Sequence, residues 1–209
     1  MTTAKSDAFG NADWKRLLRT LGEDPDRQGL VETPERVRKA WAHWTRGYQE
    51  DPASILKMFE DGSEHYNELI VVRKIPVYSH CEHHLAPFFG HAAIGYLPNG
   101  HIVGLSKLTR LVNCFAARLQ VQERLTQQIA ESLLLHLRPQ AVGVIIRCRH
   151  MCMESRGVAV PGEETVTSAM LGDLQNNHAL RNEFLSLTRP ASLPPHLAPP
   201  RTQNFAQWG

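Results

Sequence analysis

One stretch of the chain is dense in side chains that bind metals: Ser79-His80-Cys81-Glu82-His83-His84-Leu85-Ala86-Pro87-Phe88-Phe89-Gly90. Within it, Cys81 and His84 have the Cys-x2-His spacing with which a single loop holds one ion through two ligands. Farther along, a run rich in β-branched residues predicts a buried strand over 142–153 that carries Cys148, His150 and Cys152. Because side chains two apart on a strand share a face, these three are expected to point the same way.

If that strand end meets the loop, two thiolates and one imidazole converge on a zinc ion. The fourth position is then left to water, which is the open geometry of a catalytic site. Spacing alone keeps a plainer alternative open, because free cysteines are usually small buried hydrophobes. The density of histidines favours a metal site. Five of the eleven histidines of the chain lie in or near these two stretches: His80, His83, His84, His91 and His150.

Composition describes an ordinary globular protein of one domain with extensions. The chain has 209 residues, of which 42% are hydrophobic and 21% charged. A formal charge of +2 is too small to indicate a nucleic-acid partner, and no run approaches the roughly 20 apolar residues that span a bilayer. The N-terminus lacks the apolar core of a signal peptide, and the four cysteines, unevenly placed and mixed with histidines, resemble ligands in a reducing compartment more than a disulfide framework. We therefore predict a cytoplasmic protein without nucleic-acid or membrane partners.

Helical patterns fill the first third of the chain, after a disordered N-terminus over 1–12. Apolar periodicity predicts helices over 13–21, from about 33 to 46, and over 52–59. Thr33 is the expected N-cap of the second, with Pro34 in its first turn. Charges beside its stripe, Lys39 among them, are most simply solvated.

Strand patterns and two long helices follow. Strands are predicted over 69–72, 75–78, 91–97 and 102–105, with a hairpin turn at Pro98-Asn99-Gly100 between the last two. Ser106 is expected to cap a helix, and a second helix spans 122–137. Strands over 142–153 and 165–170 and a helical turn over 182–187 complete the pattern. The order ββααββ predicts an α+β fold, an antiparallel sheet with two helices on one face. Exposed edges of such a sheet favour assembly with other copies.

We divide the chain accordingly into a helical N-terminal region over 13–66 and a catalytic domain over 67–188. The segment 189–209 is rich in proline and lacks apolar periodicity, so we predict a disordered tail.

Two helix starts carry polar groups suited to a nucleotide. Lys107 and Arg110 lie in the first turn of the helix after Ser106, where positive charge is unfavourable for the helix unless an anion binds there. An ordinary serine cap with two exposed cations remains the alternative. At the next helix, Gln122-Glu123 combines a carboxylate with an amide, which is able to bind a guanine edge, although the helix dipole alone also explains the glutamate.

Several long motifs resemble type I GTP cyclohydrolase, in the order and spacing of that family, from about Asp13 to Leu187. They are 79–84, 104–108, 118–126, 150–153, 155–157 and 165–172. The resemblance implies a tunnelling fold and a homodecamer of two stacked pentamers, with active sites at subunit interfaces. It also implies conversion of GTP to 7,8-dihydroneopterin triphosphate and formate, the entry to tetrahydrofolate or pterin synthesis.

The resemblance also assigns residues. It implies one Zn2+ per subunit on Cys81, His84 and Cys152, which leaves Cys148 as a spare thiol. His83 and His150 match proton-transfer histidines, and Ser106 is a further catalytic candidate. The residues that match substrate binders are Gln122 and Glu123 for guanine; Leu105, Ser106, Lys107, Arg110 and Arg156 for the triphosphate and ribose; and Lys39, contributed by a neighbouring subunit.

Two other functions stay open at this point. One is a relative that stops after opening the ring. The other is a non-catalytic nucleotide-sensing assembly with structural zinc, in which Cys148 or His83 would close a four-ligand site.

Overall fold

A computed structural model describes residues 10–59 and 66–190 of the chain. The predicted disorder over most of 1–12 and of 189–209 lies outside the described residues, although the first helix already begins at Asn11. Along the described residues, no helix combines the length and the apolar character needed to cross a membrane.

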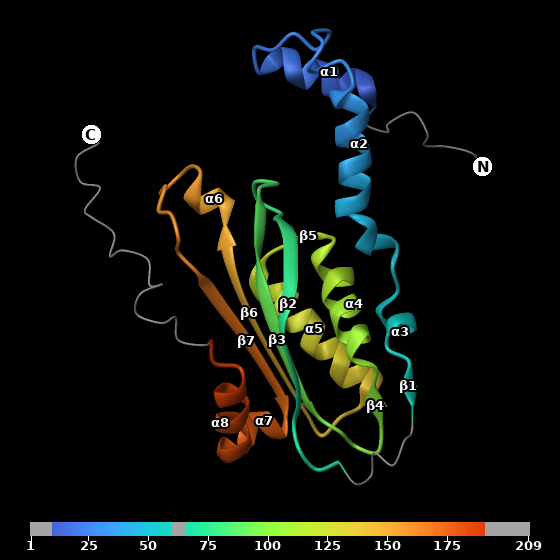
Figure 1. The fold of residues 1–209 in the computed structure, drawn as a ribbon, viewed down its shortest axis with the longest axis vertical. Helices are drawn as coiled ribbons and strands as arrows, with labels where there is room; N and C mark the ends of the chain where they lie inside the picture. Colours follow the sequence, from blue (N-terminus) through green and yellow to red (C-terminus); the bar gives the residue numbers. More distant parts are fainter. Residues whose placement is uncertain (1–9, 60–65, 191–209) are drawn as a thin grey trace.

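A five-stranded sheet forms the centre of the molecule (Figure 1). Its order is β5-β2-β3-β6-β7, and its main strands are antiparallel: β2 (Ile70–Cys81), β3 (Pro87–Leu97), β6 (Ala141–His150) and β7 (Thr165–Gly172). The short β5 (Leu119–Gln120) pairs in parallel with the end of β2. Two helices, α4 (Leu105–Ala116) and α5 (Gln122–Leu137), pack on one face through fully buried leucines such as Leu108 and Leu133. The predicted α+β fold with ββααββ order is confirmed.

The predicted hairpin at Pro98-Asn99-Gly100 is wrong. The strand β4 (Ile102–Val103) does not pair with β3 but with β1 (Met58–Phe59), in a separate two-stranded sheet. Both edges of β3 are already occupied by β2 and β6, so no edge remains for β4. The same pairing shortens the helix predicted over 52–59 to α3 (Pro52–Ile55).

Three further boundaries differ from their sequence patterns. Neither Thr33 nor Ser106 caps a helix, because α2 begins at Thr33 after Glu32, α4 begins at Leu105 after Gly104, and neither start has a side-chain cap. The strand predicted over 142–153 ends at His150, where the short helix α6 (Met151–Glu154) begins. Cys152 therefore lies on a helical turn and not on a strand face with His150.

The other face of the sheet is covered at one end by α7 (Asp173–Asn176) and α8 (His178–Leu187). Phe184 of α8 is fully buried, and its ring occupies the space left by Gly95 and Gly143, where an added Cβ would lie 2.6–2.7 Å from the ring. Residues of β6 alternate between this cluster and the main core, as the period of a strand requires.

The N-terminal helices α1 (Asn11–Thr20) and α2 (Thr33–Trp44) project beyond the sheet (Figure 1). They join the body through the 3-10 helix η1 (Arg46–Gln49), where Gly47 lies against the end of α4. Its N–H donates to the carbonyl of Ala117 at 3.0 Å, and Arg118 Nε donates to the Gly47 carbonyl at 3.0 Å. A Cβ at this position would lie 2.0 Å from the Cys114 carbonyl oxygen, so only glycine permits this approach.

Candidate active site

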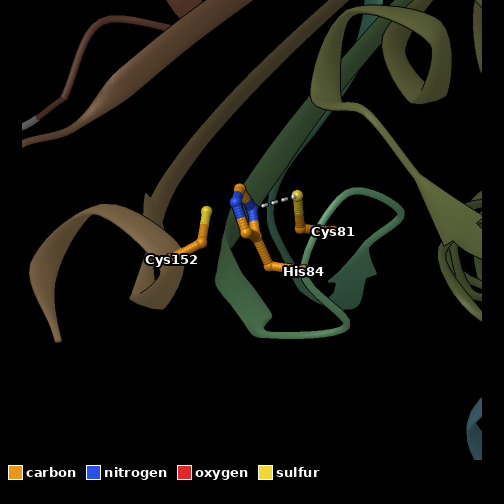
Figure 2. Close-up of side chains that lie close together, drawn as sticks. All are labelled: Cys81, His84 and Cys152. Carbon is orange, nitrogen blue, oxygen red and sulfur yellow. Dashed lines mark hydrogen bonds between the residues drawn. The ribbon is translucent and has the colours of Figure 1, made fainter. Parts of the chain in front are cut away.

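Two thiols and an imidazole meet where β2 and β6 end. Cys81 is the buried last residue of β2, His84 lies in the exposed turn before β3, and Cys152 lies half-buried on α6. Their ligand atoms all lie within 4.8 Å of one another, and Figure 2 shows the three side chains converging. The sulfur of Cys81 is 3.9 Å from Nδ1 of His84.

Strand register explains why segments so distant in sequence meet here. The strands β3 and β6 pair along their whole length, from Leu97 opposite Ala141 to Phe88 opposite His150. This register brings the residues just before Phe88, which form the loop, beside the residues just after His150, which form α6. The two halves of the predicted metal site are thus joined by the sheet itself.

The three side chains fit a metal ion. In a tetrahedral zinc site, bond lengths of about 2.0–2.3 Å place ligand atoms roughly 3.5–3.8 Å apart, close to the separations here. Without a cation, burial and the neighbouring Cys81 sulfur raise the pKa of Cys152, so the donors are better suited to a bound ion than to two free thiolates.

Cys148 does not belong to this group. It is buried in the main core, and burial raises the pKa of its thiol to about 12, which keeps the thiol protonated. His83 lies nearer, with Nδ1 3.8 Å from the Cys81 sulfur, but its side chain is 63% exposed. Among the described residues, the cluster that is able to hold a metal consists of three residues.

His150 stands beside this cluster in a fixed orientation. Its ring stacks on Phe88 with centroids 4.7 Å apart and planes 10° apart. Its Nε2 lies 2.8 Å from Oε1 of Gln122, the first residue of α5. Burial lowers the pKa of His150 and outweighs the nearby charge of Glu123, which raises it. A partly desolvated imidazole held neutral near neutral pH is suited to proton transfer.

The metal-binding turn is supported from α5. Glu82, which follows Cys81, forms an ion pair with Arg124, whose Nε also donates to Oε1 of Gln120 at 3.1 Å. The N–H of Glu82 donates to the carbonyl of Gln120 at 3.0 Å, so both the backbone and the side chain of this residue are fixed. The Arg124 guanidinium lowers the pKa of the Glu82 carboxyl group. The turn is therefore held in place before any ligand binds.

The predicted phosphate binders on α4 lie apart from the metal cluster. Ser106 and Arg110 are exposed and Lys107 is half-buried, all in the first turns of α4. Arg110 borders a cavity of about 510 Å³ between α4 and the segment 46–55, beside Arg46. The C-terminal end of α4, and not this end, adjoins β5 and the metal-binding turn.

Two further predicted binders are also exposed. Lys39 lies on the projecting helix α2, where it forms an ion pair with Glu35 at 3.4 Å. Arg156 follows α6 and is close enough to Cys152 to lower the pKa of that thiol, although burial outweighs this effect. Arg156 is thus a predicted phosphate binder that lies near the metal cluster within the same chain.

The sequence patterns indicated the metal cluster but not its surroundings. The contacts of His150 with Phe88 and Gln122, and the pair of Glu82 with Arg124, join residues far apart in the chain. The spacing of residues within a short segment does not predict such pairs. A glutamine at a helix start, opposite two β-strands, gives no signal beyond its residue type.

Comparison with known proteins gives a consistent family match. The model of the GTP cyclohydrolase I family matches residues 11–189. The chain is 82% identical over 179 residues to GTP cyclohydrolase 1 of Nitrosospira multiformis, an alignment that covers 86% of this chain and 94% of that protein. It is 73% identical over 186 residues to GTP cyclohydrolase 1 of Janthinobacterium sp. (strain Marseille), covering 89% and 94%. With GTP cyclohydrolase 1 of Corynebacterium glutamicum (strain ATCC 13032) the identity is 53% over 178 residues, covering 84% and 89%.

Proposed function

Because the chain belongs to the GTP cyclohydrolase I family, we propose that it converts GTP to 7,8-dihydroneopterin triphosphate and formate. This reaction would open the synthesis of tetrahydrofolate or another pterin. The observation that carries the proposal is the cluster of Cys81, His84 and Cys152 beside the stacked imidazole of His150, in a chain that matches the family over nearly all its described length.

Zinc, one ion per subunit, is the proposed cofactor. Cys81, His84 and Cys152 would hold it, and two thiolates with one imidazole are a donor set that zinc prefers. When bound, zinc supplies a Lewis acid that lowers the pKa of a coordinated water molecule toward about 7. The free thiols in the described part of the chain also agree with a cytoplasmic location, which stays a proposal.

The chain's own residues have the following proposed roles. His150 exchanges a proton with the imidazole ring of the purine as its C8–N9 bond opens, and the exposed His83 assists further proton transfers. Glu123, exposed at the start of α5 near His150, accepts two N–H groups of the guanine edge, with Gln122 beside it. Ser106 takes part in the ribose rearrangement; Leu105, Lys107, Arg110, Arg156 and Lys39 bind the substrate's ribose and triphosphate.

The length of helix α4 supports active sites between subunits. The helix α4 has 12 residues and is therefore about 18 Å long, and its C-terminal end adjoins the metal-binding turn. Ser106 and Lys107 lie at the far end of that length. We propose that the phosphate-binding turn of a neighbouring copy completes each site, with Lys39 reaching in from a projecting α2, in a decamer of two pentamers.

Mixing two inactive variants tests this arrangement. Lys107→Ala and His150→Ala are each expected to be inactive, whereas their co-expressed mixture should regain activity, since some interfaces combine two intact halves. With random assembly, about a quarter of the sites would be complete. The measurement is formate release by purified mixed oligomers, with each variant alone as the control. A mixture as inactive as its components contradicts sharing between subunits.

The first experiment for the function itself is incubation of zinc-loaded protein with GTP, following formate and pterin fluorescence together. Equal amounts of both support the complete reaction. Ring opening without either product would favour the ring-opening relative. Binding of GTP without any turnover would favour the sensing assembly.

A further inference from the structure

The side chain of Gln122 is enclosed, although its position in the chain predicts a substrate contact. The residue is 1% exposed. Its Nε2 lies 3.0 Å from the carbonyl oxygen of Ile146 on β6, 3.0 Å from that of Thr165 on β7, and 3.1 Å from Oγ1 of Thr167. Both N–H groups of the amide are therefore used within the chain.

These partners determine which way the amide points. Carbonyl oxygens only accept hydrogen bonds, so the atom facing Ile146 and Thr165 has to be the nitrogen. The amide oxygen then faces Nε2 of His150 at 2.8 Å, and that oxygen also only accepts. His150 must therefore carry a hydrogen on Nε2.

We propose that Gln122 is a positioning residue that fixes the tautomer and orientation of His150, so that Nδ1 is the nitrogen that exchanges a proton with the purine. This inference rests on the proposed function. In the neutral ring, Nε2–H is bonded to Gln122 and the lone pair is on Nδ1. In the protonated ring, Nδ1 gives its proton to the purine nitrogen, the N–H bonding pair stays on Nδ1 as a lone pair, and Nε2 keeps its hydrogen throughout.

The surroundings of Gln122 support a positioning role more than a role in reading guanine. Thr167, one of its acceptors, is held by Thr126 at 2.6 Å, and Thr126 also donates to the backbone carbonyl of Gln122 at 2.7 Å. The ring of His150 is fixed on its other side by the stack on Phe88. No N–H of the Gln122 side chain remains for a ligand, whereas the neighbouring Glu123 is exposed.

The kinetic test separates positioning from substrate binding. In Gln122→Met, we expect kcat for formate release to fall at least about 10-fold, as for a lost outer partner of a functional histidine. Binding should be measured with 7-deaza-GTP, which keeps the guanine edge and triphosphate but lacks the nitrogen to be protonated. Its Kd should change less than about 3-fold, a free-energy difference within RT ln 3. The matched control is Gln127→Met, on the same helix, whose amide donates to Oε1 of the exposed Glu131 at 2.8 Å.

A Kd that rises as much as kcat/KM falls would assign Gln122 to guanine binding and overturn the proposal, as would an unchanged kcat. Thr167→Val provides a second variant in case Gln122→Met does not fold, because it loosens the amide without touching His150, and a smaller loss of kcat is expected.

The tautomer itself is measurable without turnover. The ¹⁵N spectrum of histidine-labelled wild-type protein, assigned by comparison with His150→Asn, should show Nε2 protonated and Nδ1 unprotonated in the neutral ring. The opposite tautomer contradicts the positioning role even if the enzyme is active. Failure of the proposed function would instead show as wild-type protein that releases no formate.

Discussion

Replacing Cys152 by alanine is expected to remove the bound metal and nearly all activity. The variant loses one of three converging donors, whose atoms lie within 4.8 Å of one another, and leaves only Cys81 at the end of β2 and His84 in the turn that follows it. Loss of even an outer-shell partner lowers metal affinity about 10–100-fold, so loss of a direct ligand should exceed about 100-fold. Zinc content per subunit after dialysis, measured by elemental analysis, and formate release are the two readouts.

The matched control is Cys148→Ala, a thiol on the adjoining strand that is buried in the core and protonated. This variant should keep its zinc and its activity, with only the modest loss of stability of a small core truncation, about 1 kcal/mol. Zinc retained by Cys152→Ala would contradict the assigned ligands. Zinc lost from Cys148→Ala would favour a closed, structural site and with it the sensing assembly.

The fold was predictable where local pattern and tertiary structure agree. The helix over 122–137 has the predicted bounds, because an apolar stripe such as Leu125, Ile129 and Leu133 fits a single buried face. The sheet was predictable from runs of β-branched residues, which form buried strands such as β6.

The errors arose where pairing partners decide the outcome. Asn99-Gly100 does form a bend, with Gly100 at φ 74°, but the strand after it pairs elsewhere because β3 has no free edge. A turn signal specifies the reversal of the chain and not the neighbour that the next strand finds. The end of β6 at His150 is likewise set by the last pair with Phe88, which the run of residues up to 153 does not reveal.

In the candidate site, too, the features set by local sequence were predictable and those set by distant contacts were not. Cysteine and histidine spacing indicated the metal ligands, since Cys81 and His84 belong to one turn. The placement of His150 depends on Gln122, Phe88 and the register of three strands. These contacts are known only once the whole fold is known. The phosphate binders on α4 are harder still, because the single chain holds Ser106 and Lys107 at the end of this helix that lies away from the metal cluster.

Replacing His150 by alanine is expected to lower formate release by about 100- to 10,000-fold, the range for loss of a general acid or base. The ring is half-buried beside the metal cluster, stacked on Phe88 and bonded to Gln122, so its removal eliminates a proton-transfer group without opening the core. The measurements are single-turnover formate release and the Kd of 7-deaza-GTP, which should stay nearly unchanged.

Two measurements keep this result specific to proton transfer. Zinc content has to be determined in the same preparation, because Cys152 lies two positions along the chain and a displaced ligand would mimic a lost acid. His91→Ala, an exposed histidine on β3, is the control and should retain full activity. If His150→Ala keeps its zinc and releases formate at the wild-type rate, His150 is not the proton donor. The candidate proton donor would then be His83. Its Nδ1 lies 3.8 Å from the Cys81 sulfur, and His83 is not an assigned metal ligand.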